Sequence, residues 1–306
     1  MTWLILAFLS AALLGCYDTL KKVALKDNAV IPVLFFNTLF SSLIFLPLII
    51  LSGSTTMLDN SLFHVGSGGW EMHQYIVLKA VLVLSSWILG YFAMKNLPLT
   101  IVGPINATRP VMVLVGALLV FGERLNVWQW VGVMLAVLSF LMLSRSGKKE
   151  GIDFKRDHWI WMIVGAAMLG AISGLYDKFL MAPVESGGVG LDRMLVQSWY
   201  NIYQCGMMLA MLLLLWWPKH KETTPFHWHW SIIGVSVFLS TADFMYFYSL
   251  SLPEAMISIV SMIRRGSVIV SFLFGAAFFH EKNLKAKAFD LALVLLGMIF
   301  LYIGSK

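Results

Sequence analysis

The sequence alternates between long apolar runs and short polar connections. Ten runs of about 20 residues are long enough to cross the hydrocarbon core of a bilayer as helices. They cover residues 3–20, 30–52, 75–94, 98–121, 128–144, 159–182, 194–217, 229–250, 254–279 and 286–304. Only the connections at 53–74 and 145–158 are longer, and neither has room for a soluble domain. The pattern predicts an all-α membrane protein with ten transmembrane helices.

Composition agrees with a membrane location. The 306 residues are 59% hydrophobic and only 12% charged, which is about half the charged fraction of soluble domains. The net charge of +6 comes from basic residues at the ends of the runs, so we expect the lipid bilayer, and no nucleic acid, as a partner. With ten helices, fourteen lysines and arginines fall on one side and three on the other. The positive-inside rule predicts a multi-pass protein of the cell membrane, with both termini outside.

An internal repeat divides the chain. "GCYDTLKK" (15–22) and "GLYDKFLM" (174–181) both read Gly-x-Tyr-Asp near the end of a predicted helix. "LSSWILGYFAMKNLP" (84–98) matches "LSTADFMYFYSLSLP" (239–253), and an arginine follows the final proline of each by eleven residues. Two five-helix halves, 1–146 and 157–306, follow from these matches. Because five is odd, the second half crosses the membrane in the opposite sense, which predicts an inverted repeat.

Together these motifs resemble the drug/metabolite transporter superfamily. Ten helices in two halves, each with Gly-x-Tyr-Asp in its first helix, are typical of it, and "FGE" (121–123) and "FHE" (279–281) point to its EamA-type members. The resemblance extends over the whole chain. It implies secondary transport of a small metabolite through a cavity lined by helices of both halves. It does not imply a particular substrate.

Arginines inside the apolar runs are the first candidates for substrate binding. Arg264 lies roughly 17 Å along a helix from Pro253, near the middle of a core about 30 Å thick, and Arg109 has the equivalent depth in the other half. Guanidinium groups offer a planar set of donors to a carboxylate or phosphate. The alternative is a structural ion pair with a buried acid. Arg265 points about 100° from Arg264, so one arginine can pair while the other meets the ligand.

Several acids and polar residues complete the predicted site. Asp243 lies in mid-span beside the predicted path of Arg264, and we expect it to neutralise an arginine and to couple transport to protons. Asp18 and Asp177 are weaker coupling candidates, because lysines adjacent in sequence suggest local ion pairs. Pro104 and Pro110 are expected to break a helix around Asn106, which either opens a binding site or is a tolerated kink. Stacking or hydrogen-bonding roles are predicted for Trp87, Tyr91, Tyr246, Tyr17, Tyr176, Asn37 and Asn201.

Other classes of function fit less well. A membrane enzyme acting on lipid head groups needs clustered catalytic side chains, and the sequence has no such spacing. "HWHW" (227–230) is better explained by a tryptophan belt than by a metal, so neither a metal nor another cofactor is expected. A flippase for an anionic lipid carrier remains an alternative, because a large anionic head group also suits the arginines. The sequence therefore favours a transporter of a small organic anion or amphoteric metabolite that works by alternating access.

Overall fold

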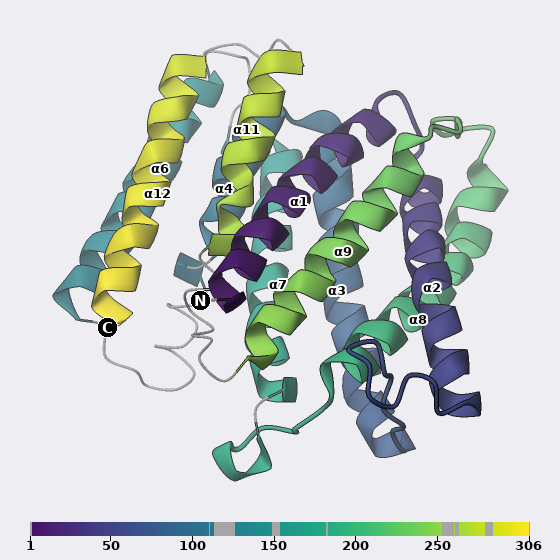
Figure 1. Ribbon diagram of the computed structural model, residues 1–306. Helices are drawn as coiled ribbons and strands as arrows, with labels where there is room; N and C mark the ends of the chain where they lie inside the picture. The colour runs from purple at the N-terminus through teal and green to yellow at the C-terminus, as the bar shows by residue number, and fades with distance from the viewer. Residues whose placement is uncertain are drawn as a thin grey trace.

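The chain folds into a bundle of helices (Figure 1). The computed structural model describes residues 2–109, 111–112, 126–148, 154–181, 183–252, 260, 263–278 and 284–305, and these contain no strand. The helices are α1 (Thr2–Leu25), α2 (Val30–Ser54), α3 (Trp70–Asn96), α4 (Leu99–Ala107), α6 (Val127–Lys148), α7 (His158–Met181), α8 (Arg193–Met211), α9 (Ser231–Ser251), α11 (Ser267–Phe278) and α12 (Leu284–Ser305). The prediction of an all-helical protein is confirmed for this part of the chain.

Seven of the described helices are long and apolar enough to cross a membrane. They are α1, α2, α3, α7, α9, α12 and the segment Arg193–Lys219, in which a π-helical turn and a 3₁₀ turn prolong α8. The described parts of α4 and α11 are shorter, with nine and twelve residues. The rest of the two predicted spans that contain them lies largely outside the described residues, so the number ten stays a prediction.

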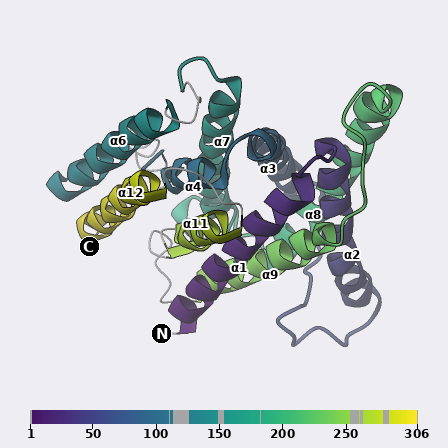
Figure 2. The same cartoon turned by 90° about the horizontal axis from the view of Figure 1, so that it is seen from above.

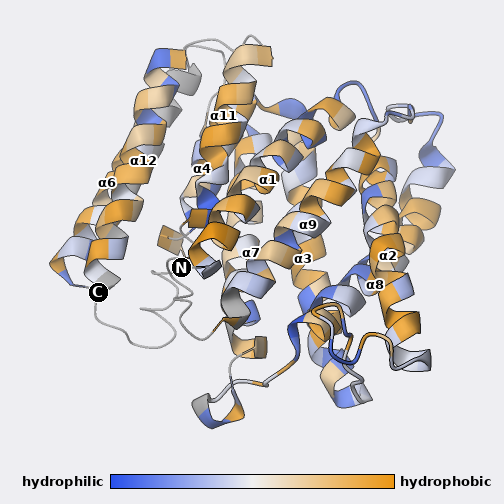
Figure 3. Ribbon diagram, viewed as in Figure 1, coloured by the Kyte–Doolittle hydropathy of each residue, from blue (hydrophilic) through white to orange (hydrophobic). Residues whose placement is uncertain are grey.

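Hydrophobic residues occur along all the helices (Figure 3), and many of their side chains are exposed on the outside of the bundle. Ile5, Leu214 and Leu273 are each more than half exposed, on three different helices. In hydrocarbon such faces carry no penalty, because lipid chains are as apolar as the side chains themselves. The arrangement is that of a multi-pass membrane protein.

Pairs of helices from the two halves of the sequence pack together. The contacts are α1 with α9, α3 with α7, α2 with α8, α4 with α11, and α6 with α12. Seen from above, α6 and α12 lie at one end, α2 and α8 lie at the other, and the remaining helices lie between them (Figure 2). The pairs in the middle therefore surround the interior in which the charged residues lie.

Small residues and serines hold these pairs close. A Cβ on Gly15 of α1 would lie 2.4 Å from the Cβ of Val270 on α11, so only glycine permits this approach. The Ser10 hydroxyl of α1 donates to the carbonyl of Ala242 on α9, at 2.7 Å. The Ser86 hydroxyl of α3 makes the same contact with Ala166 of α7, also at 2.7 Å. Each bond satisfies a buried hydroxyl across a contact between the halves.

Two basic residues depart from the predicted loop positions. Lys21 and Lys287, which the sequence counts among the charges of connecting loops, are buried on α1 and α12. Helix α12 begins at Leu284 and draws Lys287 into its contact with the rest of the bundle. The charge imbalance between the two sides is therefore smaller than the sequence indicates, although its direction is unchanged.

Candidate functional site

Charged side chains from both halves gather in the interior of the bundle. We define the charged cluster as Lys21, Lys79, Arg109, Arg264, Arg265, Asp18, Asp177 and Asp243. Electrostatic interactions link Arg109 with Asp18 and Arg264, and Arg265 with Arg109. The cluster therefore brings together the arginines of both repeats, as well as all three aspartates that the sequence selected.

Arg264 has an acidic partner. Its guanidinium group forms an ion pair with the carboxylate of Asp243 on α9. The Tyr200 hydroxyl of α8 donates to the other oxygen of that carboxylate at 2.8 Å. The guanidinium carbon lies 4.2 Å from the centre of the Tyr246 ring, within the range of a cation–π contact. The pairing of Asp243 with an arginine, expected from their depths in the sequence, is present, and Tyr246 takes part in it.

Arg109 lies just after the end of a short helix. Helix α4 ends at Ala107, where the Thr108 amide and hydroxyl both turn back to the carbonyl of Ile105. Pro104 lies inside α4 and does not break it; the interruption falls at Thr108, and Pro110, the second predicted breaker, lies outside the described residues. The interruption releases the chain from α4 immediately before the arginine.

Arg109 interacts electrostatically with Asp18 but forms no direct ion pair with a described residue. Its guanidinium group lies over Gly170 of α7, where a Cβ would come within 2.7 Å of Cζ and Nη1. Its Nε and the Oδ1 of Asn106 are buried without a hydrogen-bond partner. Among the described residues neither Arg109 nor Arg265 forms an ion pair. Two guanidinium groups in this interior are thus left to interact with something else.

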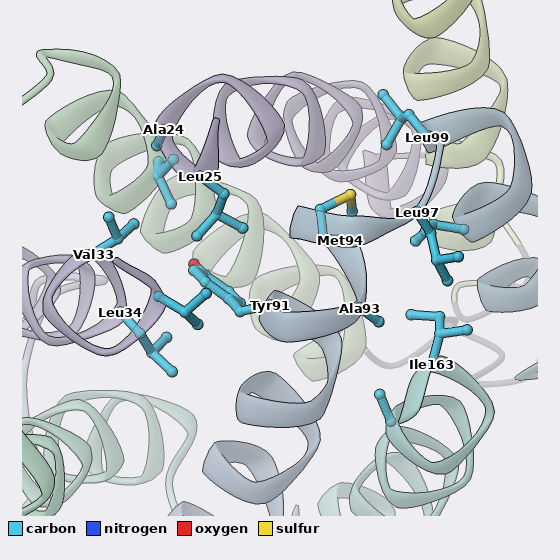
Figure 4. Packing of buried hydrophobic residues seen from close by; sticks show 14 of the residues in the cluster. Ala24, Leu25, Val33, Leu34, Tyr91, Ala93, Met94, Leu97, Leu99 and Ile163 are labelled. Atoms are coloured by element: carbon cyan, nitrogen blue, oxygen red, sulfur yellow. The ribbon is translucent and has the colours of Figure 1, made fainter. Parts of the chain in front are cut away.

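Asp18 belongs to a hydrogen-bonded group in the first half. Lys21 donates to its carboxylate at 2.8 Å, which is the local ion pair that the sequence suggested. The same ammonium group lies 4.3 Å from the centre of the Tyr17 ring. Tyr17 donates to the Tyr91 hydroxyl at 3.4 Å, and the Asn37 amide donates to it at 3.0 Å. Figure 4 shows Tyr91 among buried aliphatic side chains of α1 and α2.

Asp177 has a partner that the sequence did not suggest. Lys79 of α3 reaches across the interface to form an ion pair with it, while the side chain of Lys178, the predicted local partner, lies outside the described residues. Lys79 is 2% exposed and lies 5.0 Å from the centre of the Tyr200 ring. Sequence reasoning missed Lys79. It is the only ionisable residue between positions 74 and 94, and intramembrane ions usually face a functional interior, so that signal was available.

Other predicted residues lie outside the charged cluster. Trp87 is partly buried and packs against the main apolar core. The Tyr176 hydroxyl donates to the Tyr75 carbonyl at 3.2 Å, near the surface, so Tyr176 does not mirror the buried Tyr17. The Asn201 amide donates to the carbonyl of Gln197, one turn earlier in its own helix. Glu123 and Glu281, predicted to mark helix ends, lie outside the described residues.

The balance of charge in the cluster is positive. Five cationic side chains accompany three carboxylates, and each carboxylate has a lysine or arginine partner. A buried cation without a counter-ion is costly in a membrane interior, where a carboxylate or phosphate would relieve the cost. The arrangement is chemically suited to receive one or two negative charges.

Comparison with known proteins points to a transporter family and to a known fold. The model of the EamA-like transporter family matches residues 1–145. A solved crystal structure, described only as that of a protein, aligns over 99% of this chain and 97% of its own length, with a TM-score of 0.66. At 10% sequence identity this likeness concerns the fold alone. No curated protein matches the sequence.

Proposed function

We propose that this chain, whose residues 1–145 match the model of the EamA-like transporter family, is a secondary transporter of a small organic anion. The match supports a membrane transporter of small molecules. The observation that carries the anionic substrate is the pair of guanidinium groups of Arg109 and Arg265, which form no direct ion pair with a described residue, beside three acids that each have a lysine or arginine partner. An amphoteric metabolite with a carboxylate or phosphate fits the same description.

Alternating access between two inverted repeats is the proposed mechanism. Residues 1–146 and 157–306 are the proposed repeats. Exchanging the two halves turns the contact of α1 with α9 into that of α7 with α3. The pairs α2–α8, α4–α11 and α6–α12 are each unchanged by this exchange. A symmetry of contacts of this kind supports two halves that rock against each other around a shared site in the cell membrane.

We also propose that Asp243 couples transport to protons. In the absence of substrate its carboxylate neutralises Arg264 and limits the cost of that buried charge. An arriving anion competes for the guanidinium group. The released carboxylate then lies in an apolar interior, where taking up a proton removes its charge. Asp18 and Asp177 remain weaker candidates for coupling, since each keeps a lysine.

Counterflow into proteoliposomes tests the proposed substrate class. Vesicles holding the purified protein are screened with metabolites grouped as anions, zwitterions, cations and neutral solutes. We expect anions to exchange, and Arg109→Gln to lower their uptake at least tenfold, since charge-assisted hydrogen bonds contribute about 1.5–3 kcal/mol. Arg109→Lys, which keeps the charge, should retain part of the activity.

Lys95→Gln is the matched control, because Lys95 bonds only Thr224 at the exposed end of α3. It should leave uptake unchanged. Normal anion uptake by both Arg109→Gln and Arg264→Gln, at equal protein levels, would replace the binding role with a structural one. Exchange confined to cations or neutral solutes would contradict the proposed substrate class.

A further inference from the structure

A second polar region lies beside the charged cluster, where α2, α8 and α9 meet. We call it the polar seam, and it consists of buried hydroxyl and amide side chains with no formal charge. All are less than a tenth exposed: Asn37, Ser41, Ser42, Gln197, Ser198, Asn201, Gln204, Ser236 and Ser240. Such side chains are costly to bury unless each finds a hydrogen-bond partner.

Part of the polar seam is satisfied from within. The Ser42 hydroxyl donates to the Asn201 carbonyl at 2.8 Å, joining α2 to α8. The Gln197 amide donates to the Ser240 carbonyl at 3.2 Å, joining α8 to α9. Ser240 donates in turn to the hydroxyl of Ser41 at 3.2 Å. These bonds join α2, α8 and α9, so this part of the seam has a structural role.

Another part of the polar seam has no partner. The Oδ1 of Asn37, the Oε1 of Gln197, the Oγ of Ser198 and both polar atoms of the Gln204 side chain are buried without a hydrogen bond. Each orphaned group costs about 1–3 kcal/mol relative to an apolar side chain of similar shape. Packing alone gives no reason for Gln204, which is 0% exposed and satisfies nothing.

The chemistry of the orphaned atoms selects a kind of ligand group. Asn37 and Gln197 use their amide nitrogens within the protein, so their free oxygens need donors. Gln204 needs both a donor and an acceptor. An ammonium group only donates and a carboxylate only accepts, whereas a hydroxyl group does both. A chain of hydroxyl groups matches the whole set.

The polar seam is continuous with the charged cluster. Asn37 bonds the Tyr91 hydroxyl, which accepts from Tyr17, and Tyr17 interacts electrostatically with Arg109. On the other side, Tyr200, next to Asn201, bonds Asp243. The two regions are therefore linked through Tyr91 on one side and Tyr200 on the other, as the parts of one binding site would be.

We propose that the polar seam is a subsite for the hydroxyl groups of the substrate, which is then a polyhydroxylated organic anion. This inference rests on the proposed function and narrows its substrate class. Gln204 is the residue expected to determine the preference for hydroxyl groups, because its amide has no other use among the described contacts.

Two matched pairs of probes test the subsite. Tartrate and succinate are dicarboxylates that differ by two hydroxyl groups, as do glycerol 3-phosphate and propyl phosphate. Apparent affinities come from the rise in unfolding temperature of the purified protein with each anion, since ligands that bind the folded state stabilise it. We expect the hydroxylated member of at least one pair to bind about tenfold more tightly than the other member. A tenfold difference corresponds to about 1.4 kcal/mol of added hydrogen bonding.

Gln204→Leu should abolish the preference for the hydroxylated anion, while succinate and propyl phosphate bind as they do to the wild-type protein. If Gln204→Leu does not fold, Ser198→Ala is the second variant. It removes the orphaned hydroxyl of Ser198 and should lower the preference about threefold. Ser139→Ala, which deletes a satisfied bond to the Asp290 carbonyl between α6 and α12, outside the seam, is the control and should lower stability without changing the preference.

The outcomes separate the subsite from the proposed function. Loss of preference in Gln204→Leu with normal binding of succinate or propyl phosphate supports the subsite. A preference that survives the substitution, or is absent from the wild-type protein, overturns it and leaves water as the partner of the seam. If no anion of either pair binds, the proposed function itself fails, and the subsite falls with it.

Discussion

Arg109 and Arg264 occupy equivalent positions in the two halves, yet their surroundings differ. Arg264 is paired with Asp243, whose carboxylate also accepts from Tyr200. Arg109 lies over a glycine and forms no ion pair with a described residue, while the Nε of each arginine is buried without a hydrogen bond. Aligned positions of the proposed repeat therefore hold one directly paired cation and one without a direct ion pair among the described residues.

The sequence explains the difference. In the alignment of 84–98 with 239–253, Tyr91 corresponds to Tyr246, and the position of Asp243 is occupied by Ile88. In "FFN" and "WYN", aligned in the same way, Phe36 stands where the second half has Tyr200. The first half thus lacks both groups that hold Arg264. We infer that Arg264 pairs with Asp243, the proposed coupling residue, whereas Arg109 binds the substrate.

Removing the acid from the second half should give the largest effect. Asp243→Asn keeps an oxygen that can accept from Arg264 and Tyr200, but it can no longer gain or lose a proton. We expect exchange of anions across proteoliposome membranes to continue, and accumulation driven by an imposed pH gradient to be abolished. Uptake is measured with and without the gradient.

Asp59→Asn, in the exposed connection between α2 and α3, is the control and should accumulate substrate normally. If Asp243→Asn still accumulates substrate against its gradient with the same pH dependence, Asp243 is not the coupling residue.

Adding an acid to the first half should make the two arginines alike. Ile88→Asp places a carboxylate at the counterpart of Asp243, on a helix that packs against the α7 surface under Arg109. A neutralised Arg109 attracts substrate less, so we expect anion affinity to fall about tenfold. The measurement is the concentration dependence of counterflow.

Asparagine has nearly the same shape as aspartate but no charge, so Ile88→Asn should keep most of the affinity for the anion. Equal losses in the aspartate and asparagine variants would attribute the effect to packing, and the comparison between the arginines would lose its electrostatic explanation.

The helical fold and much of the charged cluster could be predicted from the sequence because both follow from rare features of an apolar chain. Runs of apolar residues predict helices, and charges inside them predict an interior site. Asp243 and Arg264 are found together because fixed helical rise places them at the same depth.

The sequence could not predict which side chains form pairs across the contacts between helices. Asp177 has a lysine next to it in sequence, yet Lys79 of α3 is its partner, since the contact of α3 with α7 brings the two together. Tyr176 repeats the motif of Tyr17 but lies near the surface, because the two halves do not present the same face to the interior. Side-chain direction depends on packing that no local motif records.

The smallest expected effect comes from moving Arg109 without changing its charge. Gly170→Ala introduces a Cβ that would lie 2.7 Å from the guanidinium carbon, closer than real contacts allow. The flexible arginine side chain must shift by part of an ångström, while alanine favours the helix by about 0.5–1 kcal/mol. Gly174, one turn further along α7, has open space at the same position and is the matched control. We expect Gly170→Ala to weaken anion binding about threefold, which is about half of a tenfold step in free energy, without lowering the unfolding temperature. Gly174→Ala should gain the same helical stability and bind as the wild type does. If both alanine variants bind anions equally well, the position of Arg109 over Gly170 has no part in recognition, and the cation that binds the anion must be sought at Arg265.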